Sequence, residues 1–250
     1  MNVLEIKDLC VQVAGKVLLR DLNLTVPAGE VHALFGLNGS GKTSLMMTIM
    51  GFAGYEVTGG QILFEGQDIT HLDITERAKL GIGIAAQRPP TIHGVKLRHI
   101  LDYMTVDRPQ QAHKVTELAR EARMEAFLDR DINGGLSGGE IRRSELLQLL
   151  AIQPVFSMMD EPDSGVDLES LKLMGNLINM LFSRDRLHPV KRKAGIVITH
   201  NGNILDYVHV DKAHVMLDGQ IGCSGNPCMI LDTIRNCGYE ECTRCVQKGV

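Results

Sequence analysis

The sequence predicts an α/β fold built around a mixed β core, and two observations support this prediction. Residues 31–35, 155–159 and 196–199 are apolar almost throughout, as strands are when both faces of a parallel sheet are covered. Segments with a helical pattern lie between these runs, at residues 42–50, 140–151 and 168–182. Because strands that alternate with helices pair in parallel, this order favours an α/β core.

Two regions are expected to depart from the parallel core. Apolar and polar residues alternate over the first 26 positions, which predicts short strands in an antiparallel N-terminal β subdomain. Residues 113–127 have the pattern of a charged amphipathic helix with few strand signals nearby, so we expect 91–150 to be an inserted α-helical subdomain. The chain is then a single domain over 1–250, with a catalytic core at 1–90 and 151–225 and a cysteine-rich tail at 226–250.

Charge and hydropathy exclude several classes of protein. With 26 Lys and Arg against 30 Asp and Glu, the net charge is −4, so no overall basic field would attract nucleic acid. The richest apolar stretch, 146–159, has 14 residues and includes two Gln, a Ser and a Pro, whereas a membrane-spanning helix needs about 20 apolar residues. The N-terminus is too charged for a signal peptide. We therefore expect a cytoplasmic protein that binds no nucleic acid and does not itself insert into a membrane.

A glycine-rich segment follows the first apolar run. Residues 36–43 fit the phosphate-binding pattern G-x-x-x-x-G-K-[ST], and a helix is expected to start near Lys42. Glycines let several N–H groups point into one hollow, and the helix N-terminus adds partial positive charge. Lys42 would reach the β- and γ-phosphates, and the Thr43 hydroxyl would hold Mg²⁺. The predicted nucleotide-binding residues here are Gly36, Leu37, Asn38, Gly39, Ser40, Gly41, Lys42, Thr43 and Ser44.

Two adjacent carboxylates, Asp160 and Glu161, close the second apolar run. At a strand tip, Asp160 would bind Mg²⁺ directly or through water, and Glu161 would polarise the attacking water as a general base. Such a pair also occurs as a solvated turn, and its functional reading depends on the preceding strand and on the phosphate-binding loop upstream.

Gln87 and His200 each follow an apolar strand. A glutamine there would reach Mg²⁺ or the attacking water, and an imidazole would form a hydrogen bond with the γ-phosphate. Each signal is weak in isolation, because Gln is common on surfaces and a lone His is usually structural. Taken together, the predicted catalytic residues are Glu161, His200 and Gln87, and the predicted Mg²⁺ ligands are Thr43, Gln87 and Asp160.

A second glycine motif, Leu-Ser-Gly-Gly-Glu at 136–140, precedes a helix. Ser137 can cap that helix, and Gly138 and Gly139 leave its N–H groups open to an anion. This is a second phosphate-binding end without a lysine. We interpret it as serving a nucleotide that is held mainly by another copy of the chain.

These motifs together resemble the nucleotide-binding domain of the ABC ATPases, over essentially the full length of the chain. The matching elements, in family order, are the loop at 36–43, Gln87, the signature at 136–140, the pair Asp160 and Glu161, the segment 164–167, and His200. The resemblance implies ATP and Mg²⁺ as cofactors. It also implies a head-to-tail homodimer in which residues 137–139 of one copy complete the ATP site of the other.

Within this family the chain is most similar to the SufC ATPases of the SUF iron–sulfur cluster assembly system. The similar features are Glu140 in the signature, Asp163 after the acidic pair, the segments 31–33, 168–172 and 204–207, and the pair Gly238 and Tyr239. The resemblance implies that ATP-driven dimerisation reshapes a SufB-like scaffold protein. The alternative is the ATPase subunit of an ABC membrane transporter. A third class, DNA-associated or translational ABC proteins, is disfavoured because the chain has no room for long coiled coils and no second such domain.

Six cysteines are distributed unevenly, with five of them in the last 28 residues. Cys237, Cys242 and Cys245 have the spacing of the first three ligands in a plant-type ferredoxin, and Cys228 could be a fourth. On a short flexible loop, these thiolates could wrap zinc or an iron–sulfur cluster. The alternative is a set of reduced thiols, some of them buried as small hydrophobic side chains.

Overall fold

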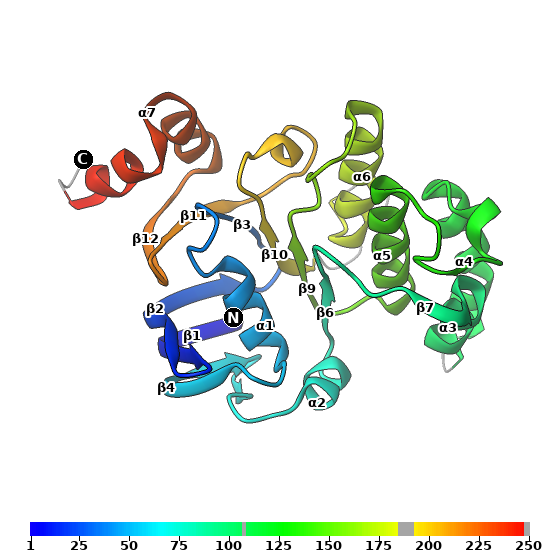
Figure 1. The fold of residues 1–250 in the computed structure, drawn as a ribbon, viewed down its shortest axis with the longest axis horizontal. Coiled ribbons are helices and arrows are strands. Elements are labelled where there is room, and N and C mark those ends of the chain that lie inside the picture. The colour runs from blue at the N-terminus through cyan, green and yellow to red at the C-terminus, as the bar shows by residue number, and fades with distance from the viewer. Residues whose placement is uncertain (107–108, 185–192, 248–250) are drawn as a thin grey trace.

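A six-stranded mixed sheet forms the centre of the computed structural model, which describes residues 1–106, 109–184 and 193–247 (Figure 1). Its strand order is β12-β11-β3-β10-β9-β6, and all neighbours pair in parallel except β11 and β12. The strands are β3 (Val31–Phe35), β6 (Ile82–Ala85), β9 (Phe156–Asp160), β10 (Ala194–Ile198), β11 (Lys212–Leu217) and β12 (Gln220–Gly225). The three predicted apolar runs are therefore neighbouring strands of one sheet, and the predicted α/β fold is confirmed.

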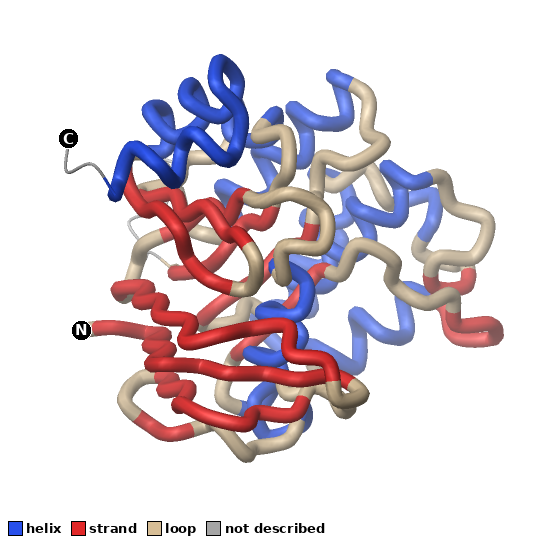
Figure 2. The backbone as a smooth tube through the Cα atoms, turned by 60° about the vertical axis from the view of Figure 1, so that its left-hand side comes forward, coloured by secondary structure: helices blue, strands red, loops and turns tan. Residues whose placement is uncertain are grey.

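The N-terminal residues form an antiparallel sheet beside this core (Figure 2). Its order is β2-β1-β4-β5, with β1 (Asn2–Val13), β2 (Lys16–Pro27), β4 (Glu56–Phe64) and β5 (Gln67–Asp68). The prediction of short strands was wrong, because β1 and β2 each run for 12 residues. Several register shifts interrupt their pairing. A bulge lets a long strand bend without ending.

Helix α1 (Lys42–Met50) lies between the two sheets and fixes the phosphate-binding loop at its N-terminus. Leu45, Met46 and Ile49 are buried in one cluster with residues of both sheets. Gly51 caps the C-terminus of α1 in the left-handed conformation, which glycine adopts without a steric cost. Helix α2 (Ile74–Lys79) follows and packs near the same core.

Helices cover the other side of β9 and β6 (Figure 1). They are α3 (Leu97–Thr105), α4 (Pro109–Glu121), the short turn η1 (Glu125–Phe127), α5 (Gly138–Ile152) and α6 (Leu168–Leu181). The helix predicted at 113–127 ends at Glu121, since Arg123 takes a positive φ of 53°. A small sheet of β7 (Ile92–Lys96) and β8 (Asp131–Ile132) lies in the same region and was not predicted.

The C-terminal segment forms helix α7 (Pro227–Gln247), so the flexible loop predicted for the cysteines was wrong. Gly238 kinks this helix with φ 81° and ψ 174°. Ile230, Leu231 and Cys242 pack on β3, β11 and β12, and this apolar contact explains why the segment is ordered. Between β10 and β11 the chain makes one more short turn, η2 (Asn203–Asp206). In the part of the chain that the structure describes, no helix has the length and apolar character needed to span a bilayer.

Candidate active site

The loop between β3 and α1 is shaped by close backbone approaches. A Cβ atom at Gly36 would lie 2.6 Å from the carbonyl oxygen of Met216, and one at Gly41 would lie 2.9 Å from the Met216 side chain. Gly41 also has φ 108°, a conformation that residues with a Cβ rarely adopt. The glycine pattern is therefore a requirement of the fold at this point as well as of phosphate binding.

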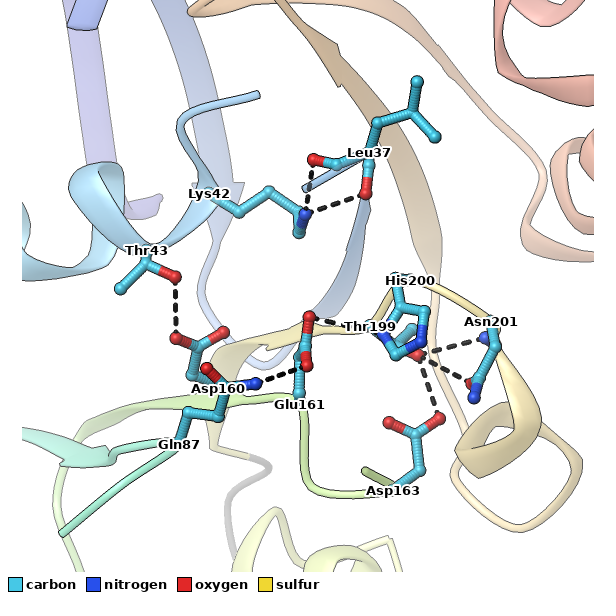
Figure 3. Close-up of polar contacts among 12 residues, drawn as sticks. Leu37, Lys42, Thr43, Gln87, Asp160, Glu161, Asp163, Thr199, His200 and Asn201 are labelled. Atoms are coloured by element: carbon cyan, nitrogen blue, oxygen red, sulfur yellow. Dashed lines mark hydrogen bonds and ion pairs between the residues drawn. The ribbon is translucent and has the colours of Figure 1, made fainter. Parts of the chain in front are cut away.

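The side chain of Lys42 lies across this loop (Figure 3). Its Nζ donates hydrogen bonds to the carbonyl oxygens of Gly36 at 2.7 Å and Leu37 at 2.9 Å. Burial lowers the pKa of Lys42 from its ordinary value, and the nearby carboxylates of Glu161 and Asp160 oppose that shift. Lys42 thus places a cation inside the loop, where a phosphate oxygen could replace the two carbonyl acceptors.

The remaining loop residues differ in exposure. Leu37, Asn38 and Gly39 are exposed, whereas the Ser40 hydroxyl is buried with no hydrogen-bond partner among the described residues. Ser44 lies in the first turn of α1 and is partly buried. An unpaired buried hydroxyl is costly, and a bound phosphate would give it a partner. These residues therefore fit a nucleotide's phosphate chain.

Thr43 and Asp160 meet although they are 117 residues apart. The Thr43 hydroxyl donates to Asp160 Oδ2 at 2.8 Å. Burial raises the pKa of Asp160, and Glu161 adds to this shift, whereas the Thr43 hydrogen bond, Lys42 and Arg142 oppose it. Carboxylate and hydroxyl oxygens are the hard ligands that Mg²⁺ prefers. The pair therefore fits a Mg²⁺ ion bound beside the phosphate loop.

Glu161 lies between the two residues whose sequence signals were weak. Its Oε2 accepts a hydrogen bond from Gln87 Nε2 at 2.6 Å, and its Oε1 lies 3.3 Å from His200 Nδ1. Figure 3 shows the three side chains converging from the ends of three strands, next to Lys42 and Asp160. All the predicted catalytic residues are thus brought together at the carboxyl edge of the sheet.

A polar network behind this cluster was not predicted as functional. Asp163 is buried and its Oδ2 accepts from the Thr199 hydroxyl at 2.9 Å and from the Ile204 amide. The Thr199 hydroxyl in turn accepts from the Gly202 amide at 3.0 Å. Arg142, also buried, donates to the Ala86 carbonyl at 2.7 Å. The network fixes the segments that carry His200 and Gln87. The sequence had singled out Asp163 only as a feature shared with the SufC ATPases, and no sequence signal pointed to Arg142 or Thr199.

Residues 137–139 do not join the cluster. Ser137 caps α5: its hydroxyl accepts from the Glu140 amide, and the Glu140 carboxylate accepts from the Ser137 amide at 2.7 Å. That backbone hydrogen bond lowers the pKa of Glu140. Ser137 and Gly138 are exposed, and the atoms nearest to a Cβ at Gly139 would belong to Ser170. The predicted capping is confirmed, and the N-terminus of α5 is presented outward.

The cysteines of the tail do not form a metal site in the described part of the chain. Cys228 and Cys237 are exposed, whereas Cys242 is buried with its Sγ 4.0 Å from that of Cys223. Among the described side chains, no group of three or more His, Cys, Asp or Glu could hold a metal ion. The side chain of Cys245 lies outside the described residues.

The fold and this site define a P-loop nucleotide hydrolase. Residues 19–164 match the sequence family described as ABC transporter. A probable ABC transporter ATP-binding protein of Streptococcus pyogenes serotype M18 is 38% identical over 236 residues, covering 90% of each chain. A probable ATP-dependent transporter of Synechocystis is 38% identical and covers 96% of this chain and 95% of its own. The chain belongs to the ABC transporter family of ATP-binding proteins.

Solved structures agree on the fold. A nucleotide-free ATP-binding cassette of an ABC transporter superposes with a TM-score of 0.78 at 23% identity, covering 96% of this chain and 98% of its own. CbiO1 of Clostridium perfringens, part of the ABC transporter complex cbiONQ, gives 0.72 at 22% identity, with 98% and 99% coverage. Family membership supports ATP and Mg²⁺ as the bound species and ATP hydrolysis as the activity.

Proposed function

We propose that this ATPase closes on ATP as a head-to-tail homodimer and drives a SufB-like scaffold protein in iron–sulfur cluster assembly. The contact of Glu161 with both Gln87 and His200, beside Lys42 and Asp160, is the observation that supports the catalytic part. The partner rests on the sequence resemblance alone.

The phosphate loop would bind ATP through residues 36–44. In this proposal Lys42 exchanges its two carbonyl acceptors for β- and γ-phosphate oxygens. Gly39 and Asn38 offer backbone N–H groups from the exposed rim of the loop. Thr43, Asp160 and Gln87 would hold Mg²⁺, which when bound neutralises charge on the phosphate oxygens.

Hydrolysis would use the carboxylate of Glu161 as the general base. Glu161 accepts a proton from the attacking water, and the Gln87 amide orients that carboxylate by its hydrogen bond at 2.6 Å. His200 lies 3.3 Å from the same carboxylate. From there its ring would form a hydrogen bond with the γ-phosphate and stabilise charge as the bond between the γ-phosphate and the leaving ADP breaks.

The position of residues 137–139 supports a role for a second copy of the chain. They lie at the exposed N-terminus of α5, where Ser137 caps the Glu140 amide. A helix N-terminus attracts phosphate. In a head-to-tail dimer, Ser137, Gly138 and Gly139 of one copy would meet the γ-phosphate held by the other.

Two kinds of partner protein are candidates for this ATPase. Glu140 and Asp163 favour a SufB-like scaffold by resemblance, and Asp163 is buried where it fixes the segment before His200. The names of the relatives favour the membrane subunit of a transporter instead. The cysteine-rich tail has no part in either proposal, because Cys228 and Cys237 are exposed while Cys242 is buried elsewhere.

The test is capture of the tagged protein from its own cells without oxygen, followed by mass spectrometry of what co-purifies. A SufB-like chain without membrane spans, in near one-to-one ratio, is the expected result. A polytopic membrane protein in that ratio would overturn the scaffold proposal and show that the chain is the ATPase subunit of a membrane transporter. Cells carrying the tag alone provide the control for non-specific capture.

A further inference from the structure

The backbone of His200 is held by a residue from the far end of the chain. The hydroxyl of Tyr239, on α7, donates a hydrogen bond to the carbonyl oxygen of His200 at 2.5 Å. The two residues are 39 positions apart, and Tyr239 is partly buried. The family resemblance singled out Gly238 and Tyr239 on α7 without giving either a role, so the contact with His200 appears only in the folded chain.

The same hydroxyl also lies near the phosphate loop. Burial raises the pKa of Tyr239 above its ordinary value of 10.0, and a hydrogen bond with the backbone of Gly36 opposes that shift. The phenol therefore keeps its proton at neutral pH and remains a donor to His200.

Helix α7 is packed firmly enough to act as a support. Gly238 redirects the helix just before Tyr239, and Cys242, one turn later, is buried against Cys223. On the other side of the kink, Leu231 is so close to Gly202 that a Cβ there would lie 2.5 Å from Leu231 Cδ1. The segment around His200 therefore contacts α7 on both sides of the kink.

The ring of His200 needs such support, because it is not fixed by burial. Its side chain is 42% exposed, and its Nδ1 lies 3.3 Å from Glu161. An exposed ring keeps its place only if its backbone does. The Thr199 network holds the residue before it, and Tyr239 holds the carbonyl of His200 itself.

We propose that Tyr239 is a positioning residue for ATP hydrolysis, fixing the backbone of His200 so that its imidazole stays beside Glu161. The proposal rests on the role of His200 given under the proposed function. It assigns to the C-terminal helix a part in turnover that does not involve contact with the nucleotide.

Tyr239→Phe tests the proposal, because it removes one hydroxyl and keeps the packing. Steady-state ATPase assays on the full chain should show kcat lowered about three- to tenfold, the effect of one lost hydrogen bond, with KM for ATP unchanged. Tyr103→Phe makes the same chemical change at a tyrosine that is 77% exposed, and should leave both constants as in the wild type. Wild-type kcat in Tyr239→Phe, or an equal rise in KM, would overturn the proposal.

A double-mutant cycle separates positioning of His200 from a general structural effect. In single-turnover assays with excess protein, Tyr239→Phe should slow hydrolysis in the wild-type background and have no further effect in His200→Ala. The same slowing in both backgrounds would show that Tyr239 does not act through His200. If His200→Ala hydrolyses ATP at the wild-type rate, the role proposed for His200 fails and this inference fails with it. If His200→Ala is slow but Tyr239→Phe hydrolyses ATP at the wild-type rate, the role of His200 stands and only the role proposed for Tyr239 fails.

Discussion

Gln87 Nε2 donates to Glu161 Oε2 across 2.6 Å, and this bond joins the tips of two neighbouring strands, β6 and β9. It leaves Glu161 Oε1 directed at His200. One oxygen of the carboxylate is thereby used for orientation and the other faces the ring that would contact phosphate. A base held in this way is ready for proton transfer from a water molecule.

Glu161→Gln should separate ATP binding from ATP hydrolysis. The amide keeps the shape of the side chain but cannot accept the proton, so kcat should fall about a hundredfold or more. The phosphate loop is unaltered, so ATP should still bind. Phosphate release, nucleotide binding and light scattering check this, and ATP-dependent dimers should accumulate. Unchanged turnover would show that Glu161 is not the base.

Lys42→Ala should remove the cation of the phosphate loop. A hydrogen bond from a charged group contributes about 1.5–3 kcal/mol, so ATP affinity should fall about ten- to hundredfold. Titration with a fluorescent ATP analogue measures the change. Lys79→Ala, in the last turn of α2 and exposed, is the matched control and should bind as the wild type. Equal affinities in the two variants would contradict the role of Lys42.

Ser137→Arg should block closure of the dimer while leaving each phosphate loop intact. The variant is therefore expected to bind ATP and not to hydrolyse it. Mixing it with Lys42→Ala gives a sharper result, because a head-to-tail pair of the two puts both defects in one site and leaves the other site complete. Activity should reappear in the mixture although neither variant is active alone. A mixture as inactive as its components would argue against a site shared between copies.

The parts of the fold that could be predicted are those determined by local patterns. The helix at 42–50 was predicted with the bounds of α1, because a glycine-rich loop starts it and Gly51 ends it. The three predicted apolar strands were placed within a residue or two of β3, β9 and β10, since buried parallel strands are continuous apolar runs. The two-residue strand β8 was missed, because so short a segment carries no period.

The contacts that could not be predicted depend on packing between distant segments. The cysteine spacing did not indicate that residues 227–247 form a helix. Cys242 and Cys223 are buried in the structure, as cysteines are when they pack as small hydrophobic side chains. The sequence indicated that Gln87, Glu161 and His200 belong to one site through their order in a known family. Tyr239 entered that resemblance only as half of the pair Gly238 and Tyr239, with no role attached, and only the fold shows that it reaches the carbonyl of His200.

A buried histidine pair should make the free energy of unfolding depend on pH. His214 Nε2 lies 2.9 Å from His32 Nδ1, and its Nδ1 lies 2.6 Å from the Ser224 hydroxyl. Burial lowers the pKa of His214 to about 3, helped by His32 and Lys212. Burial also lowers the pKa of His32, against the opposing effect of Glu30.

The unfolded chain therefore takes up protons at these two histidines more readily than the folded chain does. The contribution of His214 to the free energy of unfolding is complete above the unfolded pKa near 6.5 and is lost as the pH falls from there toward 3. At pH 5.5 the loss should be about 1.4 kcal/mol for His214, since each pH unit below the unfolded pKa costs that much. Thermal unfolding at pH 7.5 and 5.5 measures it. In His214→Gln the fall in melting temperature between the two pH values should be smaller, whereas His93→Gln, at an exposed histidine, should behave as the wild type. Equal falls in all three proteins would show that the pair does not titrate on unfolding.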